Sequence, residues 1–317
     1  MPATSTSSTS PPAIEVAGLR KAYGKFMALR GIDLRVPEGA VFGFLGPNGA
    51  GKTTAIRCLL DLIRPCGGDV RVLGMNPQGD PVGVKARCGY LPGELRLDEN
   101  LTVSATLKFF RAVRGGNGEM EKRALELAER LQLNLRAKVK TLSKGNKQKV
   151  GIIAAFLHQP ELLLLDEPTS GLDPLVQQTV LELVREAREA GATVFFSSHV
   201  LAEVQQIADE VAIIREGQIV ETGLTEALTG GGMMRVKVIF EAPQAVAKTE
   251  LEDIDGVTVI SMEDDGRVVR LAVEGGMNRL LKLLAAHEVE SLESRPPNLE
   301  EVFLAYYSED SNGKGNE

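Results

Sequence analysis

The alternation of hydrophobic and polar positions divides this chain into a long first part and a short second part. From residue 14 to about residue 230, short apolar runs alternate with segments of helical periodicity, which predicts an α/β domain with a largely parallel core sheet. Uninterrupted apolar runs are typical of parallel strands buried on both faces. Such runs occupy residues 41–45 and 162–165, and the strand pattern returns at 193–196 and 210–214. Alternating segments at 14–24 and 32–36 suit antiparallel edge strands instead.

A helical period interrupts the strand pattern in the middle of this first part. Residues 101–114 and 119–133 carry apolar side chains at steps of three and four. We therefore expect a helical subdomain, at about 98–155, inserted between strands of a nucleotide-binding core at 14–230.

The second part follows a run of three glycines at 230–232, which is typical of a linker. It has strand-like segments at 235–240 and 257–262, and the turn Asp264-Asp265-Gly266 leads into a third at 267–273. Residues 277–287 and 299–307 have helical patterns. These elements predict a small α+β domain at 235–307, and the polar ends at 1–13 and 308–317 are predicted to be disordered tails.

Composition narrows the class of protein. The chain has 317 residues, enough for two domains, and its net charge of -7 argues against nucleic acid as the main partner. No apolar stretch approaches the roughly 18 residues needed to cross a bilayer. Three cysteines without a CxxC pair favour neither a metal site nor a disulfide, and indicate a reducing cytoplasm.

The segment from Gly46 to Thr53 has the spacing G-x-x-x-x-G-K-[ST] of a loop that wraps phosphates. Glycines let backbone N–H groups approach phosphate oxygens, Lys52 offers a positive charge to the terminal phosphates, and the Thr53 hydroxyl can ligate magnesium. An apolar strand precedes the loop and a helix follows it. The alternative, a glycine-rich turn with a chance lysine, does not account for that order.

A second chemical signal stands at the end of the apolar run at 162–165. There Asp166 can hold magnesium, and Glu167 can orient and polarise the water that attacks a γ-phosphate. Alone, two acids after a strand could equally form a solvated turn. A phosphate loop in the same chain favours the functional interpretation.

Three further segments stand in a characteristic order around the acidic strand. Residues 142–146 precede it, residues 170–173 follow it, and Ser197-Ser198-His199 ends the next strand. With them, residues 14–225 resemble the nucleotide-binding domain of an ABC transporter. The resemblance implies a P-loop NTPase core with a parallel sheet, antiparallel edge strands and a helical insertion. It also implies that ATP, with magnesium on Thr53 and Asp166, is bound by the loop residues Gly46, Pro47, Asn48, Gly49, Ala50, Gly51, Lys52, Thr53 and Thr54.

The resemblance carries over further roles. Ser143 and Gly145 match the signature motif, which contacts the nucleotide of the opposite subunit, and Asp173 matches the D-loop across the dimer interface. His199 matches the switch histidine near the γ-phosphate and would be catalytic with Glu167 and Lys52. Tyr23 matches the aromatic that stacks on adenine. Plainer interpretations stay open: an N-cap for Ser143, a strand-end residue for His199, a packed edge aromatic for Tyr23.

Two departures from the family pattern matter. Lys144 and Asn146 replace the usual second glycine and glutamine of the signature motif, while Ser143 remains. Gly93 stands where the family usually has a glutamine that senses magnesium and the membrane partner. The neighbouring Glu94 is a candidate substitute.

Together these features predict an ATPase subunit of an ABC transporter. The stretch 296–304 resembles the tail of bacterial drug and polymer exporters, which favours export. The implied partners are a separately encoded transmembrane permease and a second nucleotide-binding domain, expected as a homodimer at the cytoplasmic face of the membrane. The alternative is a soluble ABC ATPase with a regulatory, translation or DNA-related role. A domain that binds ATP without hydrolysing it is disfavoured by Glu167 and His199.

Overall fold

The computed structural model describes residues 11–116, 118–229, 233–243, 245–296 and 299–300. The chain forms two compact units, residues 1–223 and 224–317. The division lies ahead of the glycine run at 230–232, which is outside the described residues. Each unit is taken by itself below.

A three-stranded antiparallel sheet begins the first unit. Its strands are β1 (Pro12–Tyr23), β2 (Phe26–Pro37) and β4 (Gly67–Val72), in the order β2-β1-β4. The predicted tail at 1–13 extends too far, because residues 12 and 13 belong to β1. Pro12 pairs with Pro37, and the fully buried Ala13 accepts a backbone hydrogen bond from Leu73.

The six-stranded sheet of the first unit has the order β5-β6-β7-β3-β8-β9. The pairs from β5 through to β8 are parallel, which confirms the predicted core. Continuous apolar sequence explains the burial of β3 and β6 on both faces. The strands are β3 (Val41–Leu45), β5 (Cys88–Leu91), β6 (Leu162–Asp166), β7 (Thr193–Ser198), β8 (Glu210–Arg215) and β9 (Gln218–Leu224).

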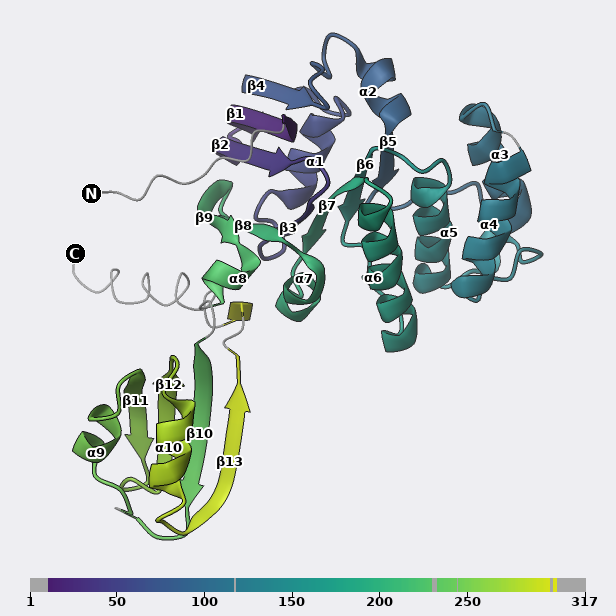
Figure 1. Cartoon of the computed structure of the whole chain (residues 1–317). Coiled ribbons are helices and arrows are strands. Elements are labelled where there is room, and N and C mark those ends of the chain that lie inside the picture. The colour runs from purple at the N-terminus through teal and green to yellow at the C-terminus, as the bar shows by residue number, and fades with distance from the viewer. Residues whose placement is uncertain (1–10, 117, 230–232, 244, 297–298, 301–317) are drawn as a thin grey trace. The chain divides into compact units, whose positions relative to one another are not determined.

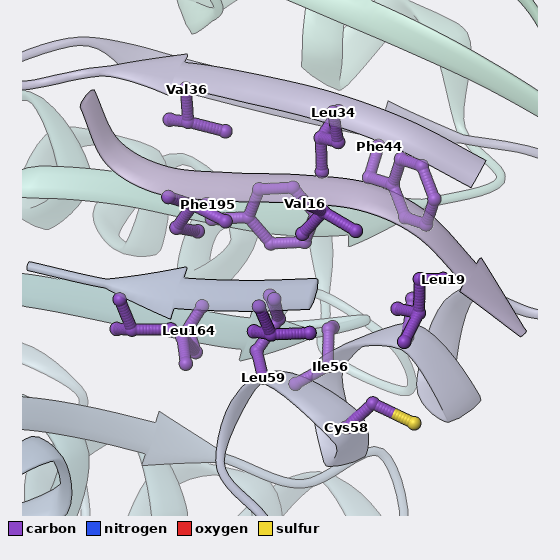
Figure 2. Close-up of a cluster of buried hydrophobic side chains, with 14 of the residues drawn as sticks. Val16, Leu19, Leu34, Val36, Phe44, Ile56, Cys58, Leu59, Leu164 and Phe195 are labelled. Carbon is purple, nitrogen blue, oxygen red and sulfur yellow. The ribbon is translucent and has the colours of Figure 1, made fainter. Parts of the chain in front are cut away.

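Helices and the antiparallel sheet enclose this core. Helix α1 (Lys52–Leu59) packs on β6, β2 and β4, while α6 (Pro174–Glu189) and α7 (Leu201–Ile207) pack on β7 and β3. Figure 2 shows the hydrophobic cluster in which both sheets and α1 meet, including Leu34, Phe44, Ile56 and Phe195. This packing fixes the start of α1 against the ends of the central strands.

The helical insertion consists of α3 (Val103–Val113), α4 (Gly118–Arg130), the short 3₁₀ helix η1 (Val139–Thr141) and α5 (Lys144–Phe156). Helices α3, α4 and α5 pack on one another, and α5 also packs on β5 (Figure 1). The two helices expected at 101–114 and 119–133 are thus confirmed to within three residues. The short α2 (Pro81–Arg87) precedes β5. Within the described part of the chain, every helix is too short or too polar to cross a membrane.

The second unit has the order β-α-β-β-α-β after the single turn α8 (Thr225–Leu228). Its strands form one antiparallel sheet in the order β11-β12-β10-β13, a ferredoxin-like arrangement (Figure 1). Positive φ values of 52° and 50° at Asp264 and Asp265 confirm the predicted hairpin turn. The predicted helix at 299–307 lies outside the described residues apart from 299 and 300. The elements are β10 (Met234–Phe240), α9 (Lys248–Glu252), β11 (Val257–Glu263), β12 (Val268–Val273), α10 (Met277–Leu284) and β13 (Val289–Arg295).

Candidate nucleotide-binding and hydrolysis site

The site lies where β3, β6 and β7 end side by side. Parallel strands present their carboxyl ends at one edge of a sheet, where ligands of open α/β sheets bind. Here β3 leads into the phosphate loop, β6 into Glu167, and β7 into His199. Residues separated by about 150 positions in the sequence therefore meet.

The phosphate loop ends in Gly51, whose φ of 115° only glycine adopts readily, and α1 begins at the next residue. The loop thus delivers the positive end of the α1 dipole and its first N–H groups to the site. Lys52 is only 6% exposed. Its Nζ donates to the carbonyl oxygens of Gly46 at 2.6 Å and Pro47 at 3.2 Å, which hold the ammonium inside the loop.

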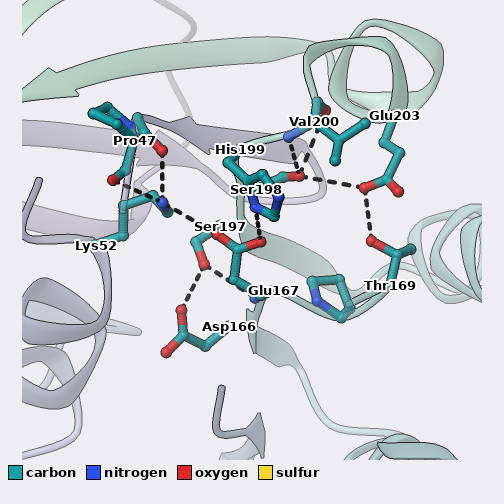
Figure 3. Close-up of polar contacts among 12 residues, drawn as sticks. Pro47, Lys52, Asp166, Glu167, Thr169, Ser197, Ser198, His199, Val200 and Glu203 are labelled. Atoms are coloured by element: carbon teal, nitrogen blue, oxygen red, sulfur yellow. Dashed lines mark hydrogen bonds and ion pairs between the residues drawn. The ribbon is translucent and has the colours of Figure 1, made fainter. Parts of the chain in front are cut away.

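Glu167 connects the loop to the histidine (Figure 3). Its Oε1 forms an ion pair with Lys52 Nζ at 3.1 Å, and its Oε2 lies 2.6 Å from Nδ1 of the half-exposed His199. The backbone of Glu167 is left-handed, with φ of 52°, and its N–H donates to the Oγ of Ser197 at 3.1 Å. A carboxylate held in this way can accept a proton from a water beside a phosphate.

Asp166 is fully buried beside this carboxylate, yet only one of its oxygens is satisfied. Oδ1 accepts a hydrogen bond from Ser197 Oγ at 2.6 Å, whereas the buried Oδ2 has no hydrogen-bond partner among the described residues. Such an orphaned oxygen fits a metal ligand. A carboxylate oxygen with a hydroxyl such as that of Thr53 is a hard donor set, which suits magnesium shared with phosphates.

A pocket of about 250 Å³ runs along the loop to Glu167. Tyr23, 47% exposed, belongs to its lining, and an aromatic ring there offers a face on which a base can stack. Phe26, 62% exposed, stands beside it and was not predicted; an aromatic on each side of the turn at 24–25 was its sequence signal. The full lining is Tyr23, Phe26, Ala28, Pro47, Asn48, Gly49, Gly51, Lys52, Thr53, Thr54 and Glu167.

The predicted signature residues lie elsewhere. The exposed Ser143 caps α5, its Oγ accepting from the Asn146 N–H at 3.2 Å, so the capping role is real. A Cβ on Gly145 would lie 2.5 Å from the Gly171 carbonyl, which explains glycine there. Asp173 caps α6. The chain therefore does not bring Ser143, Gly145 or Asp173 into the lining described for its own nucleotide pocket.

Gly93 lies beside Asp166, the candidate metal ligand. A Cβ there would stand 3.0 Å from Asp166 Oδ2. The adjacent Glu94 is exposed and lines a different pocket with Lys144 and Lys147. Residue 93 thus contributes backbone, and no side chain, beside the Oδ2 atom of Asp166.

Two buried polar residues next to the site were not predicted. Glu203 of α7 accepts hydrogen bonds from Thr169 Oγ1 at 2.7 Å and Ser198 Oγ at 3.3 Å, and burial raises its pKa. Gln148 of α5 donates to the carbonyl oxygens of Glu167 and Pro168. In sequence both look like polar positions on a helix surface, so only tertiary packing reveals them.

Comparison with known proteins agrees with this geometry. The model of the ABC transporter family matches residues 29–170. The chain is 35% identical to the linearmycin resistance ATP-binding protein LnrL of Bacillus subtilis (strain 168), covering 92% of this chain and 97% of that protein. It is 31% identical to the Nod factor export ATP-binding protein I of Rhizobium leguminosarum bv. viciae, covering 94% and 95%. A solved structure of an ATP-binding subunit of an ABC transporter matches with a TM-score of 0.64 and 31% identity, over 68% of this chain and 91% of that one.

A phosphate loop, a carboxylate paired with a histidine beside it, and relatives matched over nearly their whole length lead to one conclusion. The chain belongs to the ABC transporter family and is an ATP-binding, ATP-hydrolysing subunit of such a transporter.

Proposed function

We propose that two copies of this chain close head to tail on two ATP molecules and drive a separately encoded membrane permease in export. The observation that carries the proposal is the separation of two half-sites. The phosphate pocket contains Lys52 and Glu167, whereas the exposed Ser143 lies outside its lining. A second copy would supply the missing half, because each chain has both halves.

Binding is assigned to the loop and the hairpin aromatics. Backbone N–H groups of residues 48–54 and the ammonium of Lys52 would take the phosphates, and Tyr23 would stack on the base, with Phe26 beside it. The signature end of α5, a helix N-terminus capped by Ser143, suits the γ-phosphate of ATP on the opposite chain. Closing two chains would exclude water from both nucleotides.

Hydrolysis is assigned to Glu167 and His199. Glu167 would accept a proton from the attacking water while the oxygen of that water bonds to the γ-phosphorus. The bond from the γ-phosphorus to the bridging oxygen breaks, and that oxygen leaves with ADP. His199, 2.6 Å from Glu167, would orient the carboxylate and contact the γ-phosphate. Thr53 and Asp166 would hold magnesium, which when bound neutralises charge on the phosphates.

Loss of the γ-phosphate removes the group that both chains hold, so the pair would open. Closing and opening form a two-state element whose balance the γ-phosphate biases. We assign the motion to a permease and to the cytoplasmic face of the membrane. The relative described as an export ATP-binding protein supports export, and the matched length of that protein supports a permease on another chain.

Mixing two inactive variants tests the composite site. Lys52→Ala abolishes one half-site and Ser143→Arg the other, and neither variant alone should hydrolyse ATP. In a mixed dimer, one site combines an intact Lys52 with an intact Ser143, so activity should reappear on mixing. No recovery from variants that bind each other would refute the head-to-tail homodimer.

Purification of the tagged chain from native membranes tests the partner. We expect an integral membrane protein to copurify when ATP hydrolysis is blocked by Glu167→Gln. Recovery only with ribosomes or DNA would favour the soluble ABC ATPase instead.

A further inference from the structure

The catalytic carboxylate is carried by a strained backbone. Glu167 has φ of 52°, a left-handed conformation that costs a non-glycine residue on the order of 1 kcal/mol. It also precedes Pro168, which narrows its allowed conformations further. Strained residues persist only where their surroundings hold them, and such positions cluster at functional sites. The groups that hold this backbone therefore control where the carboxylate stands.

From the strand side, Ser197 holds the N–H of Glu167. The Ser197 Oγ accepts from that N–H at 3.1 Å, and the Ser197 carbonyl does so at 3.2 Å. These contacts join neighbouring strands β6 and β7, so they belong to the rigid sheet. They fix one end of the Glu167 peptide.

From the helical insertion, Gln148 holds the other end. Its Nε2 donates to the Glu167 carbonyl at 3.1 Å and to the Pro168 carbonyl at 3.3 Å. Because both neighbours are acceptors, only the NH₂ end of the amide can face them. Gln148 is 4% exposed, so loss of its donor would leave the Pro168 carbonyl without this hydrogen bond and the Glu167 carbonyl with the Ser170 N–H, at 3.1 Å, in a dry environment. Among the described residues, no other side chain has a recorded hydrogen bond to either carbonyl.

Gln148 stands on the helix that begins at the signature motif. Ser143 caps α5, and Gln148 lies five positions further along, about 7.5 Å at the rise of an α-helix. Helix α5 is continuous from Lys144 to Phe156 and packs on α3, α4 and β5. Its first turn and the turn that carries Gln148 would therefore move together. A shift of the Ser143 end would therefore reach the carbonyl of Glu167 through the Gln148 side chain.

We propose that Gln148 is a positioning residue that couples the two half-sites of one chain: when Ser143 engages the nucleotide of the partner copy, Gln148 sets the backbone of Glu167 for hydrolysis in its own site. This inference rests on the proposed head-to-tail closure. It makes the two sites of the dimer dependent on each other, because each Ser143 acts on one nucleotide and, through Gln148, on the carboxylate beside the other.

Gln148→Met tests the positioning role, since methionine keeps the length and approximate volume of the side chain but removes the donor. We expect kcat to fall at least tenfold while KM for ATP changes less than twofold. Gln148→Asn, which withdraws the amide by one methylene, should act in the same direction if the methionine variant does not fold. A kcat within twofold of wild type, or a rise in KM that accounts for the loss, would overturn the proposal.

Arg123→Met is the matched control. Arg123 donates to the Phe156 carbonyl at 3.1 Å, so it too binds a backbone carbonyl of α5, but at the end remote from Glu167. Both variants lose a side-chain hydrogen bond to a carbonyl. Only Gln148→Met should lower kcat, and an equal loss in the control would reduce Gln148 to a structural role.

A double-mutant cycle with Ser143→Ala tests the coupling. If engagement of Ser143 acts through Gln148, the double variant should lose about as much kcat as the more damaged single variant. Losses that multiply would mean that the two residues act independently, and the coupling would be wrong. The mixing experiment with Lys52→Ala and Ser143→Arg separates the two failures. Its complete site uses Glu167 of the chain whose own Ser143 is replaced, so the coupling predicts a measurable recovery about tenfold below half of the wild-type rate. Recovery to about half of the wild-type rate would uphold the composite site and overturn the coupling, and no recovery would overturn the composite site.

Discussion

The Nζ atom of Lys52 lies 3.1 Å from the Oε1 atom of Glu167, so the cation of the phosphate loop is paired with the carboxylate to which we assign the activation of water. Lys52 is buried, and both groups line the same pocket. A γ-phosphate and Glu167 therefore compete for one ammonium. In the proposed mechanism, binding of ATP exchanges this ion pair for a phosphate contact and frees the Glu167 carboxylate for the attacking water.

Glu167→Gln should therefore strengthen nucleotide binding as well as stop hydrolysis. Removal of the carboxylate charge ends the competition for Lys52, and we expect a non-hydrolysable ATP analogue to bind about three- to tenfold more tightly, roughly 0.7–1.4 kcal/mol. Isothermal titration calorimetry measures this. Glu216→Gln, which removes an exposed partner of Arg30, is the control and should leave the affinity unchanged. Equal or weaker binding in Glu167→Gln would contradict the competition.

Gly93→Ala should weaken the response to magnesium. The added Cβ would lie 3.0 Å from Asp166 Oδ2, the buried oxygen that we assign to the metal. Crowding of this ligand should raise the magnesium concentration for half-maximal hydrolysis several-fold. Gly118→Ala is the control, because a Cβ there meets no atom within 4 Å. A magnesium titration identical to wild type would place the metal away from Oδ2.

Glu203→Gln should change how stability depends on pH. Burial raises the pKa of Glu203, so the folded state holds its proton more tightly than the unfolded state. The stability from this proton is fully present below the ordinary carboxyl pKa and is lost as pH rises through the raised value. The amide still accepts from Thr169 and Ser198 without a buried charge. We expect the variant to match or exceed the Tm of wild type at pH 8, with the difference shrinking towards pH 5.

Glu186→Gln is a control of opposite sign for the same experiment. A hydrogen bond from Arg130 lowers the pKa of Glu186, so its stabilising effect is present at neutral pH and fades as pH falls. This variant should be less stable than wild type at pH 8 and approach it in acid. If the Tm differences of both variants from wild type changed in the same direction with pH, burial would not explain the pH-dependent effect of Glu203 on stability.

Tyr23→Ala should raise KM for ATP about fivefold, the loss of roughly 1 kcal/mol of stacking. Phe26→Ala should act similarly if this second aromatic, in the same pocket, also contacts the base. Tyr23→Phe keeps a π-face and should bind ATP as wild type does. Stacking does not distinguish bases, so Tyr23→Ala should raise KM for GTP by the same factor as KM for ATP. A KM unchanged in both alanine variants would remove the hairpin from the nucleotide site.

The strands that position the site could be predicted because they are buried on both faces. Residues 41–45 and 162–165 are uninterrupted apolar runs, and both proved to be central strands. Strand β4 was missed because Gly67 and Gly68 are typical of a turn, and β5 because it has only four residues with a glycine among them. Their neighbours in the sheets, not their own sequences, make them strands.

The residues of the site also fall into some that the sequence predicted and some that it did not. Lys52, Asp166, Glu167 and His199 follow strands in recognisable order, so the sequence predicted that they would meet. Gln148 stands between two lysines on α5, and its sequence neighbours give no sign of a carbonyl belonging to residue 167. Contacts made by a helix side chain to a distant loop depend on packing angles that no local pattern encodes.

The left-handed backbone at Glu167 means that the side chain assigned to hydrolysis lowers the stability of the fold. Glycine or asparagine would adopt that conformation with less strain, but neither can take a proton from water. Selection of random variants for heat resistance alone should therefore enrich replacements at position 167 that are more durable and catalytically silent. Glu167 is therefore a residue that the proposed chemistry requires and that stability of the fold alone would not select.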